Sequence, residues 1–228
     1  VLAEAIRRRW TPEASVAAGS ITILMGGLIG LFLAAWGAGG SLLDFLQHRV
    51  DIAVREAMEL YGKMGISSDE VGPLFASVDE VRMFLLTASP GLFMAAALLS
   101  TSANFFLARK GAAHAAVAGS PAPGFTWKVP DWLVWILIGS AALLLSGVPV
   151  AKEIGFNGLL IMITVYFLQG LAIASFWIRR LRLSPFVGFV GVALLLLQPL
   201  LLLLVALVGL FDIWVVFRRH SLPTAPDA

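Results

Sequence analysis

Uncharged apolar stretches that are long enough to cross a membrane constrain the fold of this chain more than any other feature. The first of them reads SVAAGSITILMGGLIGLFLAAW and contains no charged residue. A helix needs about 20 predominantly apolar residues to cross the hydrocarbon core of a bilayer. These stretches predict an all-α protein, a polytopic transmembrane helix bundle that forms a single integral membrane domain over residues 1–228. We expect about five spans, at residues 15–36, 83–107, 132–148, 156–178 and 185–211.

The composition also indicates a membrane protein. The chain is 59% hydrophobic and 13% charged, whereas a soluble domain is about 45–50% apolar and about 25% charged. A net charge of +2 and the lack of any nucleic-acid motif argue against a nucleic-acid partner and leave the lipid bilayer as the expected one. The chain starts at Val1, inside what reads as the end of a helix. We therefore expect it to be N-terminally truncated relative to the natural protein.

Residues 42–64 have a different pattern from the spans. Apolar residues recur there at spacings of three and four, with charged residues on the opposite face, which predicts an amphipathic helix. Such a helix lies on the bilayer surface or covers the helix bundle. Its polar face mixes both signs and is not rich in Lys, which favours the covering position. The apolar positions are Leu43, Leu46, Val50, Val54, Ala57, Tyr61 and Met64.

Local signals add detail at the ends and faces of the spans. Thr11 before Pro12 and Glu13 predicts a helix start, with Thr11 as the N-cap. Gly26 and Gly30 form a GxxxG pattern, which is a packing seam or simply a reflection of how common glycine is in membrane helices. The pair at residues 152–153, Lys and Glu, reads as a solvated turn between two spans. Three tryptophans around the start of the third span suit an interfacial belt: Trp127, Trp132 and Trp135.

Basic clusters set the expected orientation, because cytoplasmic loops of membrane proteins are enriched in Lys and Arg. Clusters lie at residues 7–9, 109–110 and 179–182. With the N-terminal end inside, all three are cytoplasmic and the amphipathic helix is outside. Residues 218–219 are then outside, against the pattern. A hairpin at Pro199 would correct this, but each half would have only about 14 residues, which is too short for a span. We therefore expect five spans, with tilt or a kink at Pro199 in the last.

No catalytic signature accompanies the spans. The three histidines, His48, His114 and His220, lie outside them, and the sequence has no HExxH, no GxSxG and no P-loop. With no Cys and no intramembrane His, metal or haem ligation within the bilayer is not expected. We predict neither an enzyme nor a cofactor.

Polar side chains within the spans are the remaining candidates for function, because each is costly in hydrocarbon unless it is paired. Tyr166 and Gln169 share a helix face, and Gly170 beside them allows another helix to come close. Together the polar groups form either the lining of a central cavity or a set of interhelical hydrogen bonds. The candidate ligand-binding residues are Asn104, Asn157, Tyr166, Gln169 and Asp212.

Asp212 has two interpretations. It is either a buried acid that pairs with a cation or a proton, or a residue at the membrane interface flanked by Trp214 and Arg218. Arg218 is six residues away, so the two side chains point to different faces and a local ion pair is poor. A buried Asp212 therefore needs a partner from another helix, such as a basic group.

The order of several weak motifs along the chain resembles a known family. The fragments SPGLFMAAALLSTSANFFLARK, FTWKVPDWLVW and GFNGLLIMITVYFLQGLAIASFWIRRL, followed by VGLFDIWVVFRR, look like the YybS-like family of predicted bacterial membrane proteins. That family is distantly similar to the substrate-binding components of energy-coupling-factor transporters and to the rod-shape protein MreD. The resemblance implies a multi-pass protein of the bacterial inner membrane. It assigns no ligand to the matching positions: Pro90, Asn104, Trp127, Pro130, Asn157, Tyr166, Gln169, Gly170, Asp212 and Arg218.

These observations favour a small-solute-binding membrane component of a transport system that relies on partner subunits for energy. The solute would lie between the second, fourth and fifth spans. The alternative is a membrane scaffold or assembly factor that acts through protein–protein contacts. A proton-coupled carrier that uses Asp212 is a weaker third hypothesis.

Overall fold

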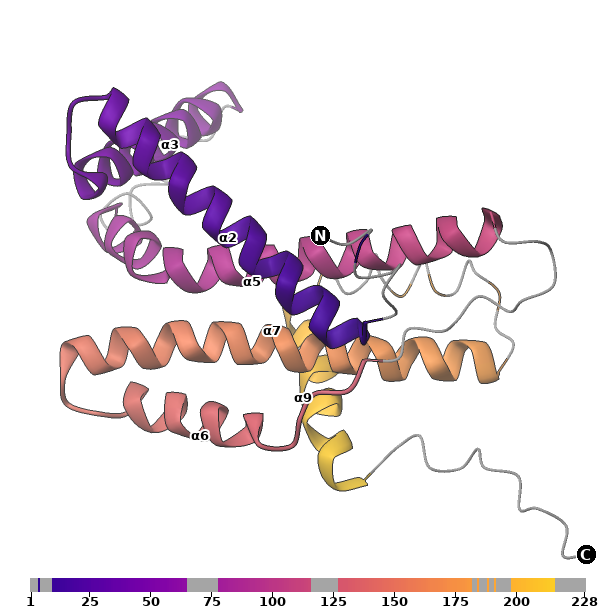
Figure 1. Ribbon diagram of the computed structural model, residues 1–228. Coiled ribbons are helices and arrows are strands. Elements are labelled where there is room, and N and C mark those ends of the chain that lie inside the picture. The colour runs from indigo at the N-terminus through magenta and orange to yellow at the C-terminus, as the bar shows by residue number, and fades with distance from the viewer. Residues whose placement is uncertain are drawn as a thin grey trace, which may run out of the picture.

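The computed structural model describes residues 10–64, 78–115, 127–181 and 198–215, together with residues 4, 184, 188 and 191. All regular structure in these ranges is helical (Figure 1). The all-α helical bundle that the sequence predicts is therefore confirmed. The helices are α2 (Pro12–Gly37), α3 (Leu42–Lys63), α5 (Val78–Ala115), α6 (Leu133–Leu144), α7 (Pro149–Arg180) and α9 (Pro199–Val215).

Three of the described helices are long and apolar enough to cross a membrane: α2, residues 82–108 of α5, and residues 149–178 of α7. The helices α6 and α9 are apolar but shorter. The predicted third span is shortened to α6 because Pro149 disfavours a helical residue before it, so the chain bends at residues 146–148. Most of the first half of the predicted fifth span lies outside the described residues, and its described part is α9.

The start of α2 confirms the predicted N-cap. The Ala14 N–H donates to Thr11 Oγ1 at 3.3 Å, and Pro12 occupies the first turn. The GxxxG pattern of Gly26 and Gly30 does not form a packing contact with another described helix. A methyl group at either glycine would meet no described atom within 4 Å. Instead Gly27 faces the ring of Phe93 in α5 so closely that an added methyl group would overlap it. Contact between α2 and α5 therefore uses a different face from the GxxxG pattern.

The amphipathic helix α3 lies against the end of α2 and the start of α5. It begins with a capping box in which Ser41 and Asp44 satisfy each other's backbone N–H groups. An ion pair joins Asp51 of α3 to Arg82 of α5. Six of the side chains between residues 45 and 54 are partly buried, on one face of the helix, whereas those described after residue 54 are all exposed. The helix thus covers the bundle with its first half only.

Helix α7 is the centre of the bundle, because it contacts α5, α6 and α9 (Figure 1). It runs parallel to α5 and antiparallel to α6. The α6–α7 contact is close because small residues line it: methyl groups at Gly155 or Gly158 would overlap Ser140. Helix α7 begins at Pro149, seven residues before the predicted span, because proline suits the first turn of a helix. Residues 152–153 are therefore helical, and their assignment to a turn was wrong.

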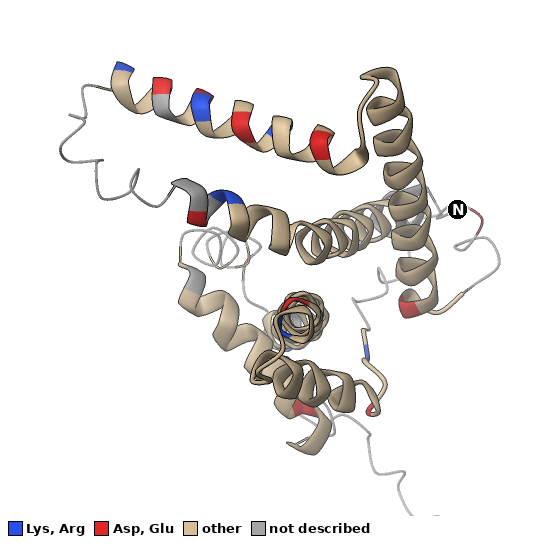
Figure 2. Ribbon diagram, turned by 90° about the vertical axis from the view of Figure 1, so that its left-hand side faces the viewer, with Lys and Arg blue, Asp and Glu red and all other residues tan. Residues whose placement is uncertain are grey.

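Charge is concentrated outside the apolar helix centres. Figure 2 shows residues of both signs along α3, whereas the other helices carry few charges between their ends. Because α5 and α7 are parallel, the basic pairs at residues 109–110 and 179–180 lie at the same end of the bundle. The same-end placement agrees with the predicted orientation, whose cytoplasmic assignment stays a prediction.

Candidate functional site

The closest helix crossing in the described structure is that of α7 and α9, and glycine makes it possible. A methyl group at Gly170 would overlap the Val205 carbonyl, and one at Gly209 would overlap the Tyr166 carbonyl. Only glycine lets two helix backbones approach to this degree. The close neighbour that Gly170 predicts is therefore confirmed, and it is α9. Side chains one turn from Gly170 on α7 or from Gly209 on α9 therefore lie close to the backbone of the other helix.

Gln169 links three parts of the chain at this crossing. Its Oε1 accepts a hydrogen bond from the Val129 N–H at 2.7 Å, and its Nε2 donates to Asp212 Oδ2 at 3.1 Å. Gln169 is 1% exposed and Asp212 is 8% exposed. The carboxylate of Asp212 is thus buried between helices and not placed at an exposed interface. A buried Asp212 was expected to need a partner from another helix, and Gln169 of α7 is such a partner. It is a neutral amide and not the basic group that was given as an example.

The segment 127–130 also belongs to this site. We call the site, formed by Gln169, Asp212 and Val129, the junction. Trp127 and Val129 are buried in the core, and the Lys128 N–H donates to Glu13 Oε1 of α2 at 2.9 Å. Trp127 is therefore not part of an interfacial belt, whereas Trp132 and Trp135 are exposed, as such a belt requires. Val129 and Glu13 were not predicted as parts of this site, because they act through a backbone N–H and a carboxylate outside the spans. The alternation of apolar and charged residues before Pro130 was the available signal.

Tyr166 lies one turn before Gln169 and is 2% exposed. Its side chain belongs to the main apolar core, a cluster that also includes buried residues of α2, α5 and α9. Its hydroxyl has no hydrogen-bond partner within the described part of the chain. A buried polar group without a partner costs about 1–3 kcal/mol, so Tyr166 calls for a partner from outside these residues.

Thr101 of α5 shares this property. Its side chain is 1% exposed, and its Oγ1 has no hydrogen-bond partner among the described residues. Phe105 lies one turn further along the same face of α5 and belongs to the same core cluster as Tyr166. Thr101 was not predicted as a site residue, because threonine is common in membrane helices and usually bonds within its own helix.

Asn157 has a separate position, at the contact of α5 and α7. Its Oδ1 accepts from the Gly91 N–H at 2.6 Å, and its Nδ2 donates to the Thr87 carbonyl at 2.8 Å. These are the two backbone groups that would bond to each other in an unbroken helix. The amide therefore bonds to both backbone groups of one turn of α5, next to Pro90. Pro90 has no N–H for the Leu86 carbonyl, which accepts from the Ser89 hydroxyl at 2.9 Å instead.

The structure thus brings Tyr166, Gln169 and Asp212 together and separates the other two candidates from them. Asn157 is engaged by backbone groups, and Asn104 lies on an exposed face of α5. Solute binding by any of the five stays a prediction. Across the described residues, no cluster of His, Asp or Glu is arranged to hold a metal ion.

Comparison with known proteins gives one match. A family model described as "Predicted membrane protein (DUF2232)" matches residues 1–213. No curated protein and no solved structure matches the chain.

Proposed function

We propose that this chain, which belongs to the DUF2232 family of predicted membrane proteins, is the small-solute-binding component of a transport system in the bacterial inner membrane. The observation that carries this proposal is the buried hydroxyl of Tyr166, which has no partner among the described residues. It lies one helix turn from the Gln169–Asp212 hydrogen bond.

The chemistry of the junction supports a small polar solute. A solute hydroxyl, amine or carbonyl would supply the hydrogen bond that Tyr166 lacks. In a low-dielectric core, that one bond is worth more than it would be in water. The Asp212 carboxylate, fixed by Gln169, adds a preference for a solute that donates hydrogen bonds or carries positive charge. The sequence has no ATPase motif, so transport would draw its energy from partner subunits.

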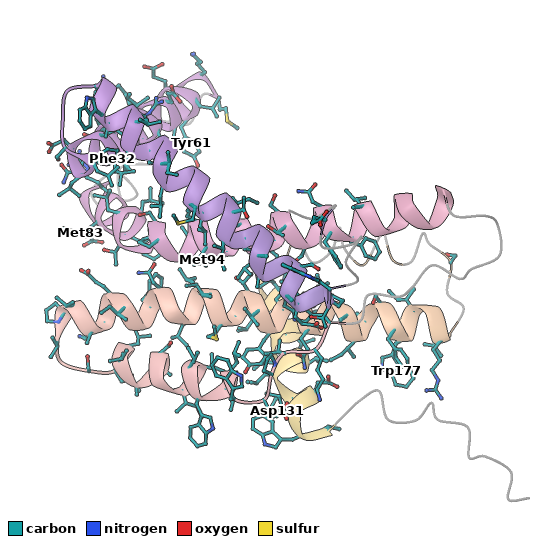
Figure 3. The ribbon with its side chains drawn as sticks, in the orientation of Figure 1. Phe32, Tyr61, Met83, Met94, Asp131 and Trp177 are labelled. Carbon is teal, nitrogen blue, oxygen red and sulfur yellow. The ribbon has the colours of Figure 1, made fainter. Side chains whose placement is uncertain are left out.

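The test is native mass spectrometry of the full chain released from its own membranes in mild detergent. We expect a bound small molecule in the wild type and its loss in Tyr166→Phe, because only the hydroxyl is removed. The matched control is Tyr61→Phe, since Tyr61 is the other tyrosine and projects from α3, away from the junction (Figure 3). An unchanged adduct in Tyr166→Phe, or no adduct in a correctly folded wild type, would overturn the proposal.

A membrane scaffold is the second candidate function, and one specific observation favours it. No described residue packs against the open face of α2 at Gly26 and Gly30. Small residues let a helix of another protein approach closely. Replacing both glycines with Ile should then abolish crosslinking to partner proteins in native membranes, whereas Leu28→Ile should preserve it. Equal crosslinking in both variants would remove the scaffold function.

A further inference from the structure

An open groove lies at one end of the bundle, between α5, α6 and α7, well away from the α7–α9 crossing. Its volume is about 580 Å³, within the range of small-molecule sites. Met83 projects at this end of α5 (Figure 3). The lining residues come from the first turns of α5, the end of α6 and the first turns of α7: Glu80, Met83, Phe84, Thr87, Leu144, Lys152, Glu153 and Phe156.

Along α5 and α7 the charged lining residues come before the aromatic ones, as expected where a helix enters a bilayer from its surface. The apolar window of α5 begins at Arg82, so Glu80 lies just outside it, and Phe84 and Thr87 lie inside. On α7 the apolar stretch begins at Pro149, so residues 152–153 lie near its start, about one turn before Phe156, and the two helices run in the same direction. Phe84 and Phe156 form an edge-to-face pair with ring centroids 5.7 Å apart. The groove thus has a charged rim at the membrane surface and apolar walls below it.

The rim carries both signs of charge. Lys152 supplies a cation, and Glu80 and Glu153 supply two carboxylates. Their side chains are exposed and form no ion pair with any residue in the ranges that the structure describes. A lysine at the membrane interface reaches toward phosphate groups while its methylene stem covers apolar surface.

We propose that this groove binds one phospholipid with a primary-ammonium headgroup, of the phosphatidylethanolamine class. Lys152 holds the phosphate, Glu80 and Glu153 accept hydrogen bonds from the ammonium group, and an acyl chain lies against Phe84 and Phe156. An anionic lipid such as phosphatidylglycerol leaves the two carboxylates without a partner. A choline headgroup carries the same charge but has no N–H to donate. This site is separate from Tyr166, so it stands or falls independently of the proposed function.

The experiment is native mass spectrometry of the delipidated full chain, titrated with phosphatidylethanolamine, phosphatidylcholine or phosphatidylglycerol. We expect the wild type to bind phosphatidylethanolamine most tightly. Glu80→Gln with Glu153→Gln should weaken that binding about two- to fivefold, as expected for partly exposed charge pairs, and leave phosphatidylglycerol binding no weaker. Lys152→Gln should weaken binding of all three lipids, because each has a phosphate.

The matched controls are Glu56→Gln with Glu59→Gln, two exposed carboxylates on α3, and Lys63→Gln at its end. These variants should bind the three lipids as the wild type does. A thermal unfolding curve for each variant separates lost lipid binding from lost folding. Equal affinity of the wild type for all three lipids, or unchanged selectivity in a folded Glu80→Gln, Glu153→Gln variant, would overturn the proposal.

Discussion

At the scale of single residues, Asn157 shows how one side chain stabilises a neighbouring helix beside a proline. Its amide accepts a hydrogen bond from the Gly91 N–H and donates one to the Thr87 carbonyl. Gly91 is suited to this position because a methyl group there would crowd Asn157. In hydrocarbon, no water is present to take over if the amide is lost.

Asn157→Leu should therefore lower the free energy of unfolding by about 1–3 kcal/mol, since it leaves a backbone N–H and a carbonyl unbonded. The measurement is thermal unfolding of the full chain in mild detergent, followed by tryptophan fluorescence. Asn104→Leu is the matched control and should have little effect, because Asn104 is exposed. Equal losses in the two variants would contradict the bridging role.

The Gln169–Asp212 contact can be tested as a pair. Gln169→Leu removes both the donor to Asp212 and the acceptor for the Val129 N–H. We therefore expect it to destabilise the protein more than Asp212→Leu does. A double-mutant cycle with Asp212→Leu should give a coupling energy of about 0.5–3 kcal/mol. Gln198→Leu, at an exposed position before α9, is the control and should show no coupling. A coupling energy near zero for the first pair would mean that the bond is not formed in the membrane.

At the scale of helices, the two kinds of glycine should behave in opposite ways. Gly170→Ala and Gly209→Ala force the α7 and α9 backbones apart and should destabilise the protein by about 1–3 kcal/mol each. Gly26→Ala and Gly30→Ala meet open space in α2 and should be neutral or stabilise it by up to about 1 kcal/mol, the difference in helix propensity. Unfolding in detergent measures both sets. Destabilisation by the α2 changes would point to a partner on that face.

The helices also show which parts of the structure the sequence can predict. The N-cap at Thr11 and the amphipathic period of α3 are local signals, and the structure confirms both. The start of α7 at Pro149 was predicted seven residues too late, because the apolar pattern does not mark where helices joined by only four residues end and begin. The shared face of Tyr166 and Gln169 follows from their spacing. The Asn157–Gly91 bond does not, because it joins residues 66 apart and depends on a helix packing that no local pattern encodes.

At the scale of the whole molecule, the bundle has two ends that should face opposite sides of the membrane. The α2–α3 and α6–α7 connections lie at one end, and the C-terminal ends of α5 and α7 lie at the other (Figure 1). The chain contains no Cys, so single cysteines can be introduced without removing native ones.

Gly40→Cys and Gly147→Cys should react with a membrane-impermeant maleimide added to intact cells, and Leu181→Cys should react only after the cells are opened. All three positions are exposed, so a difference in labelling reports the side of the membrane. Labelling of Gly147→Cys and Leu181→Cys from the same side would show that α7 does not cross the bilayer.

The bridge between Asn157 and α5 also has a consequence for how the protein is made. Gly91 is synthesised 66 residues before Asn157. At about 5–20 residues per second, the Gly91 N–H and the Thr87 carbonyl wait roughly 3–13 s for the synthesis of the amide that bonds to both. During that interval these two backbone groups lack the side-chain partner that they have in the finished protein. A ribosome stalled before residue 157 should therefore hold α5 in a form that membrane chaperones bind and quality-control proteases cut, and synthesis past the point at which residue 157 leaves the ribosome should end that susceptibility.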